Sequence, residues 1–328
     1  MEFPSASCSG RGGLVAGFVA VVLAAAAAAA AACGSPPSVP ERKVIRLTTG
    51  TPGARFHPLG QALAQAYAAA LPALEVRLLD TAGSIANVEA LQRGDADIGL
   101  SYADVAYMAS VGRLDGRRET FAELRGIAVL ELAPVHLVVR SGSAIPDAAG
   151  LRGRRIAVGP GGTGSALTAE IVLRALGIGA TAARVEPLKY NEAAARLAAG
   201  TIDAMFVTGS DPVDAVRAAT EAGARLLPLG GPAIEQLRHD YPFFRPTVIH
   251  GGTYPGHPAP TRTIGIDNLL LCRRGLDEDV VHDLTRQFFA QLPSLSILAG
   301  MDLEQAPATP IPLHDGAARY YRERELAR

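Results

Sequence analysis

The chain repeats one order of predicted elements, strand-helix-strand-helix-strand, and this repetition restricts the fold more than any other feature. In the first copy we expect strands at 43–49, 74–79 and 97–101 and helices at 59–71 and 84–93. In the second copy we expect strands at 155–158, 184–188 and 203–207 and helices at 165–176 and 191–199. Strands that alternate with helices indicate a parallel sheet covered by helices, so each copy predicts one α/β lobe.

A short internal similarity supports two related lobes. Residues 91–100 (LQRGDADIGL) and 197–206 (LAAGTIDAMF) align at an offset of 106 positions. In both segments a helix is expected to end on a glycine, Gly94 or Gly200, and an aspartate follows three residues later, where an apolar strand begins. The order helix-glycine-strand is common in α/β proteins, so this match alone is weak evidence. The repeat of all five elements around it is stronger evidence for two similar lobes.

The segment between the two copies predicts how the lobes are joined. Residues 124–140 form a long apolar stretch, as expected of a strand that crosses from one lobe to the other. After the second copy the sequence predicts strands at 246–253 and 263–272 and helices at 277–292 and 313–328. We therefore expect an α/β fold of two parallel-rich lobes joined by crossing strands. Residues 42–133 and 249–328 would form lobe 1 and residues 134–248 lobe 2, with one hinged cleft between them.

The charge balance and the missing motifs exclude several classes of function. The 328 residues include 31 Lys and Arg against 32 Asp and Glu, so a nucleic-acid partner is not expected. Three cysteines cannot build a disulfide scaffold or a four-cysteine zinc site. The sequence has no phosphate-binding P-loop, no dinucleotide fingerprint after the first strand, no H-E-x-x-H and no G-x-S-x-G. We therefore predict neither a cofactor nor a metal ion.

The N-terminal segment predicts export from the cytoplasm. Residues 14–32 lack charge and end in small residues, and Cys33 follows. We interpret 1–32 as a signal peptide and the proline-rich 33–41 as an extended tether. Small residues before Cys-Gly-Ser resemble a bacterial lipoprotein processing site, at which a lipid on Cys33 would attach the protein to a membrane. An ordinary signal peptide and a retained anchor stay open, and all three place the folded part in the periplasm or on the outer face of the cell membrane.

Each copy of the repeat opens with a glycine-rich loop between its first strand and its first helix. The loops are 48–60 (TTGTPGARFHPLG) and 159–168 (GPGGTGSALT). The first N–H groups of a helix lack partners and carry partial positive charge, and glycine lets a ligand approach them closely. The sequence therefore predicts that a small anion, such as a carboxylate, is held from both lobes.

The candidate binding residues follow from their positions at strand ends and helix starts. They are Gly50, Thr51, Arg55, Phe56, Ser84, Asn87, Tyr102, Asp104, Thr163, Gly164, Ser165 and Thr208. Ser84 is also expected as the N-cap of its helix. Arg55 is either a bidentate partner of the anion or a solvated loop cation, and Tyr102 either walls the pocket or packs in the core. Asp104 either receives an amino group or caps a helix over 105–108.

Eight segments spread along the chain are more specific than the repeat. They are FHPLG, GSIAN, GDADIG, ADVAY, PVHLVVR, GPGGTGS, GTYPG and, at 311–323, IPLHDGAARYYRE. Together they resemble TAXI-type substrate-binding proteins of tripartite ATP-independent periplasmic (TRAP) transporters. The resemblance implies a bilobed periplasmic-binding-protein fold, similar to type II, that closes on a small solute. The first glycine loop departs from the family pattern G-G-T-Y-Y-P at 54–58, which leaves the identity of the solute open.

The resemblance implies an extracytoplasmic solute receptor and not an enzyme. Such a receptor would bind a small organic anion, a dicarboxylate or an acidic amino acid, and deliver it to the membrane permease subunits of a TRAP transporter. Two alternatives stay open: a periplasmic sensing domain that reports the solute to a signalling partner, and, less favoured, a transferase on a bilobed fold. The transferase needs a titratable pair in the cleft, and Asp104 with His57 is the pair that the sequence offers.

Overall fold

The computed structural model describes Met1 and residues 42–52, 54–114, 119–179 and 181–326. Contacts divide the chain into two units, Met1–Arg42 and Lys43–Arg328, and the architecture below is that of the second unit. The predicted signal peptide after Met1, the tether at 33–41 and Cys33 lie outside the described residues. Of the helices that the structure describes, none combines the length and the hydropathy that crossing a membrane requires.

Three parallel strands in the order β2-β1-β3 form the centre of the first lobe. The elements in chain order are β1 (Lys43–Thr48), α2 (Phe56–Ala70), β2 (Leu74–Leu79), α3 (Ser84–Arg93), β3 (Ile98–Tyr102) and α4 (Ala103–Ser110). The predicted order is confirmed, but α2 begins three residues before the predicted start. Pro58 lies in its first turn, where the missing proline N–H costs the helix no hydrogen bond.

The second lobe repeats this arrangement with the strand order β7-β5-β6, again parallel. Its repeated elements are β5 (Arg155–Ala157), α5 (Gly164–Ala175), β6 (Arg184–Glu186), α6 (Tyr190–Ala198) and β7 (Ala204–Thr208). In both lobes the first strand of the copy is central and the second strand is at the edge. The internal repeat in the sequence is therefore a repeat of tertiary structure.

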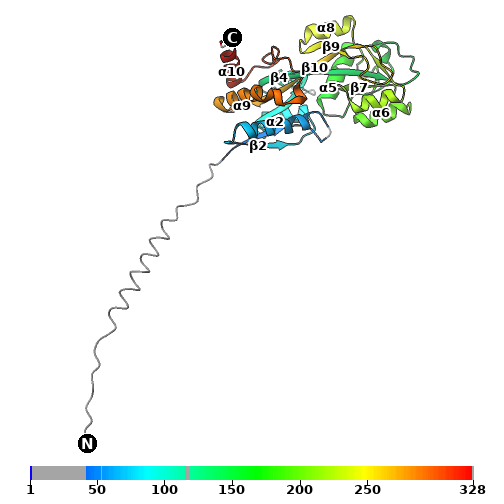
Figure 1. Ribbon diagram of the computed structural model, residues 1–328. Coiled ribbons are helices and arrows are strands. Elements are labelled where there is room, and N and C mark those ends of the chain that lie inside the picture. The colour runs from blue at the N-terminus through cyan, green and yellow to red at the C-terminus, as the bar shows by residue number, and fades with distance from the viewer. Residues whose placement is uncertain (2–41, 53, 115–118, 180, 327–328) are drawn as a thin grey trace. The chain divides into compact units, whose positions relative to one another are not determined.

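Two long antiparallel strands join the lobes into one sheet. β4 (Leu124–Val139) pairs with β10 (Thr261–Arg273) along its first part and with β7 along its last part. β10 in turn pairs with β3. The resulting order β2-β1-β3-β10-β4-β7-β5-β6 is continuous, and Figure 1 shows β4 and β10 running from one half of this unit to the other. The predicted crossing strand is confirmed.

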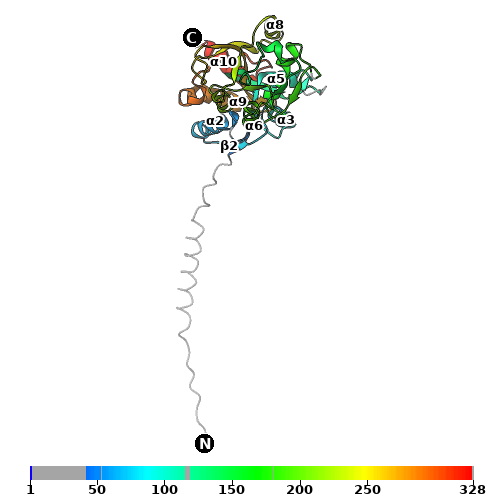
Figure 2. The same cartoon turned by 90° about the vertical axis from the view of Figure 1, so that its right-hand side faces the viewer.

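The remaining elements complete the two lobes. They are η2 (Ala148–Leu151), α7 (Asp214–Glu221), β8 (Arg225–Leu227), α8 (Pro232–Asp240), β9 (Phe244–Ile249), α9 (Glu278–Gln291), two 3-10 turns (Leu292–Ser294, Ser296–Leu298) and α10 (Asp315–Leu326). The long helix α9 packs against α2, and both views show the two side by side (Figures 1 and 2). α10 packs on α9, so the end of the described chain returns to the first lobe.

The repeated aspartate has the same structural role in both lobes. Asp97 accepts hydrogen bonds from the backbone N–H and the guanidinium of Arg46 on β1, and Arg46 also donates to the carbonyl of Gly94. Asp203 accepts the same set from Arg155 on β5, which also donates to the carbonyl of Gly200. Each lobe therefore ties the end of a helix to its central strand through one arginine and one aspartate. The Arg155 hydrogen bonds lower the pKa of Asp203 to about 2.

A buried polar network fixes the loop that follows β7. His136 lies on β4 and is fully buried; its Nδ1 is 3.1 Å from the carbonyl oxygen of Val207 and its Nε2 is 2.6 Å from Asp211 Oδ1. The hydroxyl of Tyr254 is 3.0 Å from the same Nε2, donates to Asp211 and accepts from the N–H of Val213. The histidine of the PVHLVVR segment and the tyrosine of the GTYPG segment therefore have a structural role in this network.

Candidate functional site

The N-terminus of α5, in the second lobe, lies directly against the first lobe. At Gly164 an added Cβ would meet Ser84 Oγ at 2.7 Å and Tyr102 Cδ2 at 2.8 Å. Both distances are shorter than real Cβ contacts, so only glycine allows the two lobes to approach this closely. The helix is capped by Thr163, whose Oγ1 accepts a hydrogen bond from the N–H of Ala166. The structure thus brings predicted residues from both lobes together in one contact.

Two tyrosines converge on the end of β7. The hydroxyls of Tyr102, from the first lobe, and Tyr190, from α6, each donate to the carbonyl oxygen of Thr208 at 3.2 Å. Tyr190 also accepts from the N–H of Thr208, and the side chain of Ser165 interacts with both phenols. Burial raises the pKa of both tyrosines, so both stay neutral donors.

The hydroxyl of Thr208 has no hydrogen-bond partner among the described residues, although the residue is only 3% exposed. The hydroxyl of Ser210, two residues further along, is also buried and unpartnered within the described chain. Buried hydroxyls are normally satisfied, because leaving one unpaired costs roughly 1–3 kcal/mol. Each of these two hydroxyls, at and just after the end of β7, is therefore available for a further hydrogen bond.

Asp104 links the lobes through a second hydrogen bond. One carboxyl oxygen accepts from the N–H of Val105 and the other from the hydroxyl of Thr168 on α5, at 2.6 Å. Thr168 is also 2.9 Å from the carbonyl of Gly164. Complete burial raises the pKa of Asp104 to about 7, against the hydrogen bonds from Thr168 and Val105, which lower it.

The prediction that Asp104 is the N-cap of a helix over 105–108 is wrong in its position. The helix is α4 (Ala103–Ser110), and its N-cap is Tyr102, so Asp104 lies in the first turn. Its carboxyl nevertheless accepts from a backbone N–H of that turn, which is the favourable place for an acid. The expected capping of α3 by Ser84 is also wrong, because Gly83 is the N-cap with φ +120°. The hydroxyl of Ser84 instead accepts from the N–H of Tyr102.

Asn87 is buried within the first lobe with all of its side-chain polar atoms in use. Its amide nitrogen donates to the carbonyls of Thr49 and Leu100, and its oxygen accepts from the hydroxyl of Thr81. It therefore ties the end of β1 to the middle of β3. In this arrangement Asn87 supports the binding loops, and contact with a solute stays a prediction.

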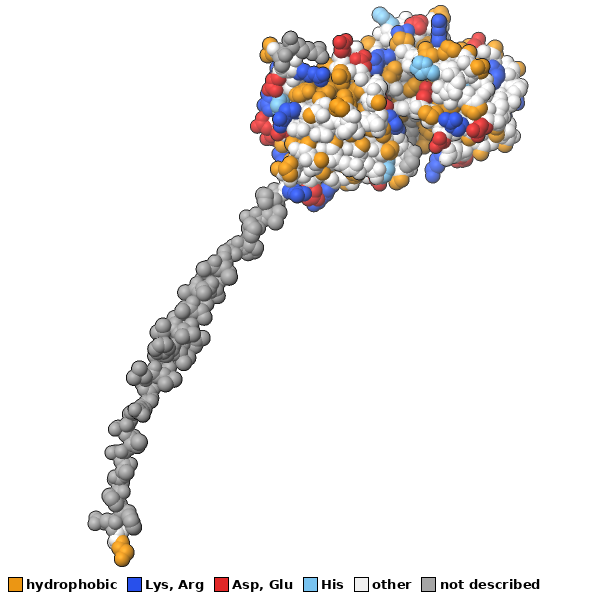
Figure 3. Space-filling view, in the orientation of Figure 1, with side chains coloured by type: hydrophobic (Ala, Val, Ile, Leu, Met, Phe, Trp, Pro, Cys, Tyr) orange, Lys and Arg blue, Asp and Glu red, His pale blue; other side chains and the backbone are white. Residues whose placement is uncertain are grey.

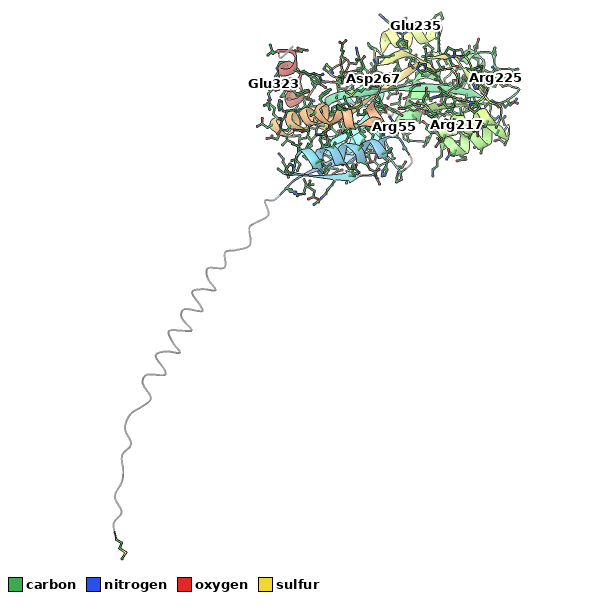
Figure 4. The ribbon with its side chains drawn as sticks, viewed as in Figure 1. Arg55, Arg217, Arg225, Glu235, Asp267 and Glu323 are labelled. Atoms are coloured by element: carbon green, nitrogen blue, oxygen red, sulfur yellow. The ribbon has the colours of Figure 1, made fainter. Side chains whose placement is uncertain are left out.

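Arg55 pairs with an acid that the sequence did not single out. Its guanidinium makes two hydrogen bonds to Glu131 on β4, at 2.9 and 2.7 Å, and a third to the carbonyl of Ile297. The amide of Asn268 donates to the same Glu131 carboxylate, while the Asn268 oxygen is buried and unpartnered within the described residues. Figure 4 shows Arg55 at the end of α2 that faces the second lobe. Arg55 is therefore not a solvated loop cation in this structure, and its contact with an anionic solute stays a prediction.

The first glycine loop places its three other predicted residues differently. Phe56 is buried and packs edge-on against Tyr102, with ring centroids 5.4 Å apart. Tyr102 thus both packs and faces the second lobe. Gly50 is buried beside Phe56, whereas Thr51 is exposed in a turn closed by the N–H of Ala54.

The titratable pair required by a transferase is not brought together. His57 pairs with Asp80 at 3.0 Å, while Asp104 bonds to Thr168. Within the described residues, no group of three or more His, Cys, Asp and Glu side chains is arranged to hold a metal ion.

Sequence reasoning missed four residues of this site. They are Glu131, Thr168, Tyr190 and Asn268. Thr168 is the last residue of the second glycine-rich loop at 159–168, and Tyr190 comes two residues after the end of the predicted strand at 184–188, where strand-end reasoning could have found it. Glu131 and Asn268 lie within long apolar strands, and a polar residue in such a strand is the signal that could have marked them.

Three solved structures resemble this chain in fold. The first is a TctC solute-binding protein from Polaromonas, with 18% identity and a TM-score of 0.50, covering 89% of this chain and 97% of that one. The second is the Xanthomonas citri protein XAC2383 bound to ATP, with 15% identity and a TM-score of 0.54, covering 86% and 98%. The third is a periplasmic transporter protein, with 16% identity and a TM-score of 0.52, covering 89% and 96%. Identities this low establish the fold alone, which is that of bilobed periplasmic binding proteins.

Sequence comparison identifies the family. A profile of the NMT1-like family matches residues 47–324, which include both lobes, the crossing strands and the IPLHDGAARYYRE segment. The match covers most of the chain, and it includes every candidate binding residue described above. This protein therefore belongs to the NMT1-like family.

Proposed function

We propose that this protein is the extracytoplasmic solute receptor of a TRAP transporter. It binds a small organic anion, a dicarboxylate or an acidic amino acid, between its lobes and delivers it to membrane permease subunits. The observation that carries this proposal is the contact at Gly164, where a helix N-terminus of the second lobe meets Ser84 and Tyr102 of the first. A helix N-terminus favours an anion, and a contact that only glycine permits is suited to lobes that close.

The polar groups around this contact support binding over catalysis. Thr208 and Ser210 offer buried hydroxyls without partners in the described chain, and Tyr102 and Tyr190 are neutral donors. Such groups orient a ligand but supply neither a nucleophile with its base nor a proton shuttle. We therefore propose a receptor and not an enzyme.

The N-terminal segment supports the part of the proposal that concerns where the receptor is located. Cleavage after residue 32 and lipid attachment at Cys33 would hold the receptor at the outer face of the cell membrane, beside the permease. The proline-rich stretch at 33–41 would act as a spacer of limited flexibility. Globomycin treatment, which blocks lipoprotein processing, would leave an unprocessed precursor that mass spectrometry detects, whereas an unchanged mature mass would contradict the lipid anchor.

Calorimetric titration tests the solute class. The protein without its first 32 residues is titrated with dicarboxylates, 2-oxoacids, acidic amino acids and uncharged amino-acid amides as controls. We expect saturable binding of an anion and no binding of the matched amides. Thr208→Val should weaken binding about tenfold, because it removes the free hydroxyl without changing the size of the side chain. Binding of no anion in the panel, or equal binding to Thr208→Val, would refute the anionic site.

A further inference from the structure

A cavity lies in the first lobe, and none of the candidate binding residues lines it. It has a volume of about 590 Å³ and is formed by the end of α9, the two 3-10 turns that follow it, the segment up to Leu303, and α10. Small-molecule sites typically have volumes of roughly 300–1,000 Å³. The cavity is therefore large enough to hold an organic molecule of moderate size.

The walls of this cavity are apolar. They include Phe289, Leu292, Leu298, Met301, Leu303 and Tyr320. Phe289 and Tyr320 stack with ring centroids 5.2 Å apart and planes 11° apart, which gives the cavity one flat aromatic wall. Leu303 is 40% exposed, more than a leucine usually is. Figure 3 shows hydrophobic side chains gathered on this half of the folded unit, with Lys and Arg side chains beside them.

The charged side chains that line the cavity are both cations, Arg286 and Arg324. The Arg324 guanidinium lies 5.1 Å from the centroid of the Phe289 ring, and no described carboxylate lies within ion-pair distance of it. Arg286 pairs with Asp283, which does not line the cavity. The lining therefore carries a net positive charge beside an apolar surface, and the molecule that complements it has one anionic end and an apolar body.

We propose that this cavity binds an amphipathic monoanion, such as a medium-chain carboxylate, as a free small molecule. The carboxylate is held by Arg324 with Arg286 beside it, and the apolar chain lies along the wall formed by Phe289 and Tyr320. This site does not depend on the proposed function of the cleft, because none of its residues belongs to the cleft and its ligand is of a different class.

Calorimetric titration with decanoate tests this site, with decylamine as a control of equal chain length. We expect decanoate to bind at one site and decylamine to bind at least tenfold more weakly. Arg324→Gln should weaken decanoate binding about tenfold, since it removes a charge-assisted contact. Arg322→Gln is the matched control, because Arg322 is exposed on the same helix but does not line the cavity, and it should leave the affinity unchanged.

Filling the cavity gives a second, independent test. Ala290 lines the cavity and is exposed, so Ala290→Trp should fold normally, occupy the cavity and abolish decanoate binding. Leu303→Asp, also at an exposed position, should weaken binding through charge repulsion and serves if the tryptophan variant is unstable. Equal affinity of the wild-type protein, Ala290→Trp and Leu303→Asp for decanoate would overturn the proposal, as would equal affinity for decanoate and decylamine.

The anion that this cavity binds comes either from a lipid surface or from a free small molecule, and a last experiment distinguishes the two. Sedimentation with phosphatidylglycerol vesicles distinguishes a lipid surface from a free molecule. We expect the wild-type protein and Ala290→Trp to sediment with the vesicles to the same extent. If the wild-type protein sediments with vesicles, and Ala290→Trp does not, the cavity is a membrane contact and our assignment to a free molecule is wrong.

Discussion

Asp104 offers the sharpest test of how the two lobes are held together. Its carboxyl is completely buried where α4 of the first lobe meets α5 of the second, and the hydroxyl of Thr168 in the second lobe donates to it. Burial raises its pKa from an ordinary value of 3.8 to about 7. No described arginine, lysine or histidine pairs with it, so the charged form has only hydrogen bonds to stabilise it.

The sign and the size of the effect follow from this shift. An acid whose pKa is raised by folding binds its proton more tightly in the folded state, so the contribution of Asp104 to stability is most favourable below the ordinary pKa. This contribution falls as the pH rises from about 4 to about 7 and is constant above that range. A shift of about three pKa units corresponds to about 4 kcal/mol, which is an upper bound because a partial opening that admits water reduces the cost.

Asp104→Asn should remove this pH dependence. The asparagine amide has the shape of the protonated acid and donates to the Thr168 hydroxyl, which then donates to the Gly164 carbonyl 2.9 Å away. We expect the two proteins to be about equally stable near pH 4 and the variant to be more stable near pH 8 by up to about 4 kcal/mol.

Urea denaturation at several pH values between 4.5 and 8.5 measures the difference. The quantity to compare is the free energy of unfolding of the variant minus that of the wild-type protein, because all other groups titrate in both. Asp214→Asn, at an exposed position, is the control and should give a difference that does not vary over this range. A difference for Asp104→Asn that is equally constant would refute the reasoning.

Three further outcomes are expected. Gly164→Ala should weaken solute binding by about tenfold or more, because a Cβ at this position meets Tyr102 and holds the lobes apart. Calorimetry would show the weaker binding, and small-angle scattering would show a larger radius of gyration. The Asp203 interactions stabilise the fold above about pH 4 by about 2 kcal/mol, and this contribution is lost as the pH falls toward 2. In acid denaturation, the free energy of unfolding of the wild-type protein should therefore exceed that of Asp203→Asn by less at pH 2 than at pH 4. His136→Ala should lower the free energy of unfolding by about 3 kcal/mol in urea, since it leaves a buried cavity and removes the hydrogen bonds of His136 to Asp211 and to the Val207 carbonyl oxygen. A loss below 1 kcal/mol would contradict the role of the network.

The repeated elements could be predicted because their boundaries carry strong local information. β2 and α3 coincide with their predicted ranges, and Gly94, which ends α3, has φ +75°, a conformation that glycine adopts without strain. By contrast α7 and α8 are short helices in segments rich in turn residues, and α8 begins at a proline after Gly231. Their stability comes from packing, which no single segment reveals.

The candidate site was predictable in position but less so in its chemistry. Strand ends and helix starts indicated Gly164, Ser165, Tyr102 and Thr208, which the structure brings together, and their contact with a solute stays a prediction. The partner of Arg55 lies 76 residues away in the sequence, and nothing near Arg55 indicates that an acid will neutralise it. Pairing across such separations depends on how the sheet is ordered, and the local pattern does not contain that order.

The hydrogen bond between Tyr102 and Thr208 joins residues 106 positions apart, which is the offset of the internal repeat. Equivalent positions of the two copies therefore face each other, as they do across an approximate twofold axis. A site on such an axis would bind a solute equally well in two opposite orientations if the two copies were identical. Here tyrosine stands opposite threonine, and the two halves differ. This difference gives the site a direction, so under the function proposed above an asymmetric solute would bind in one orientation and present the same end to the membrane partner each time.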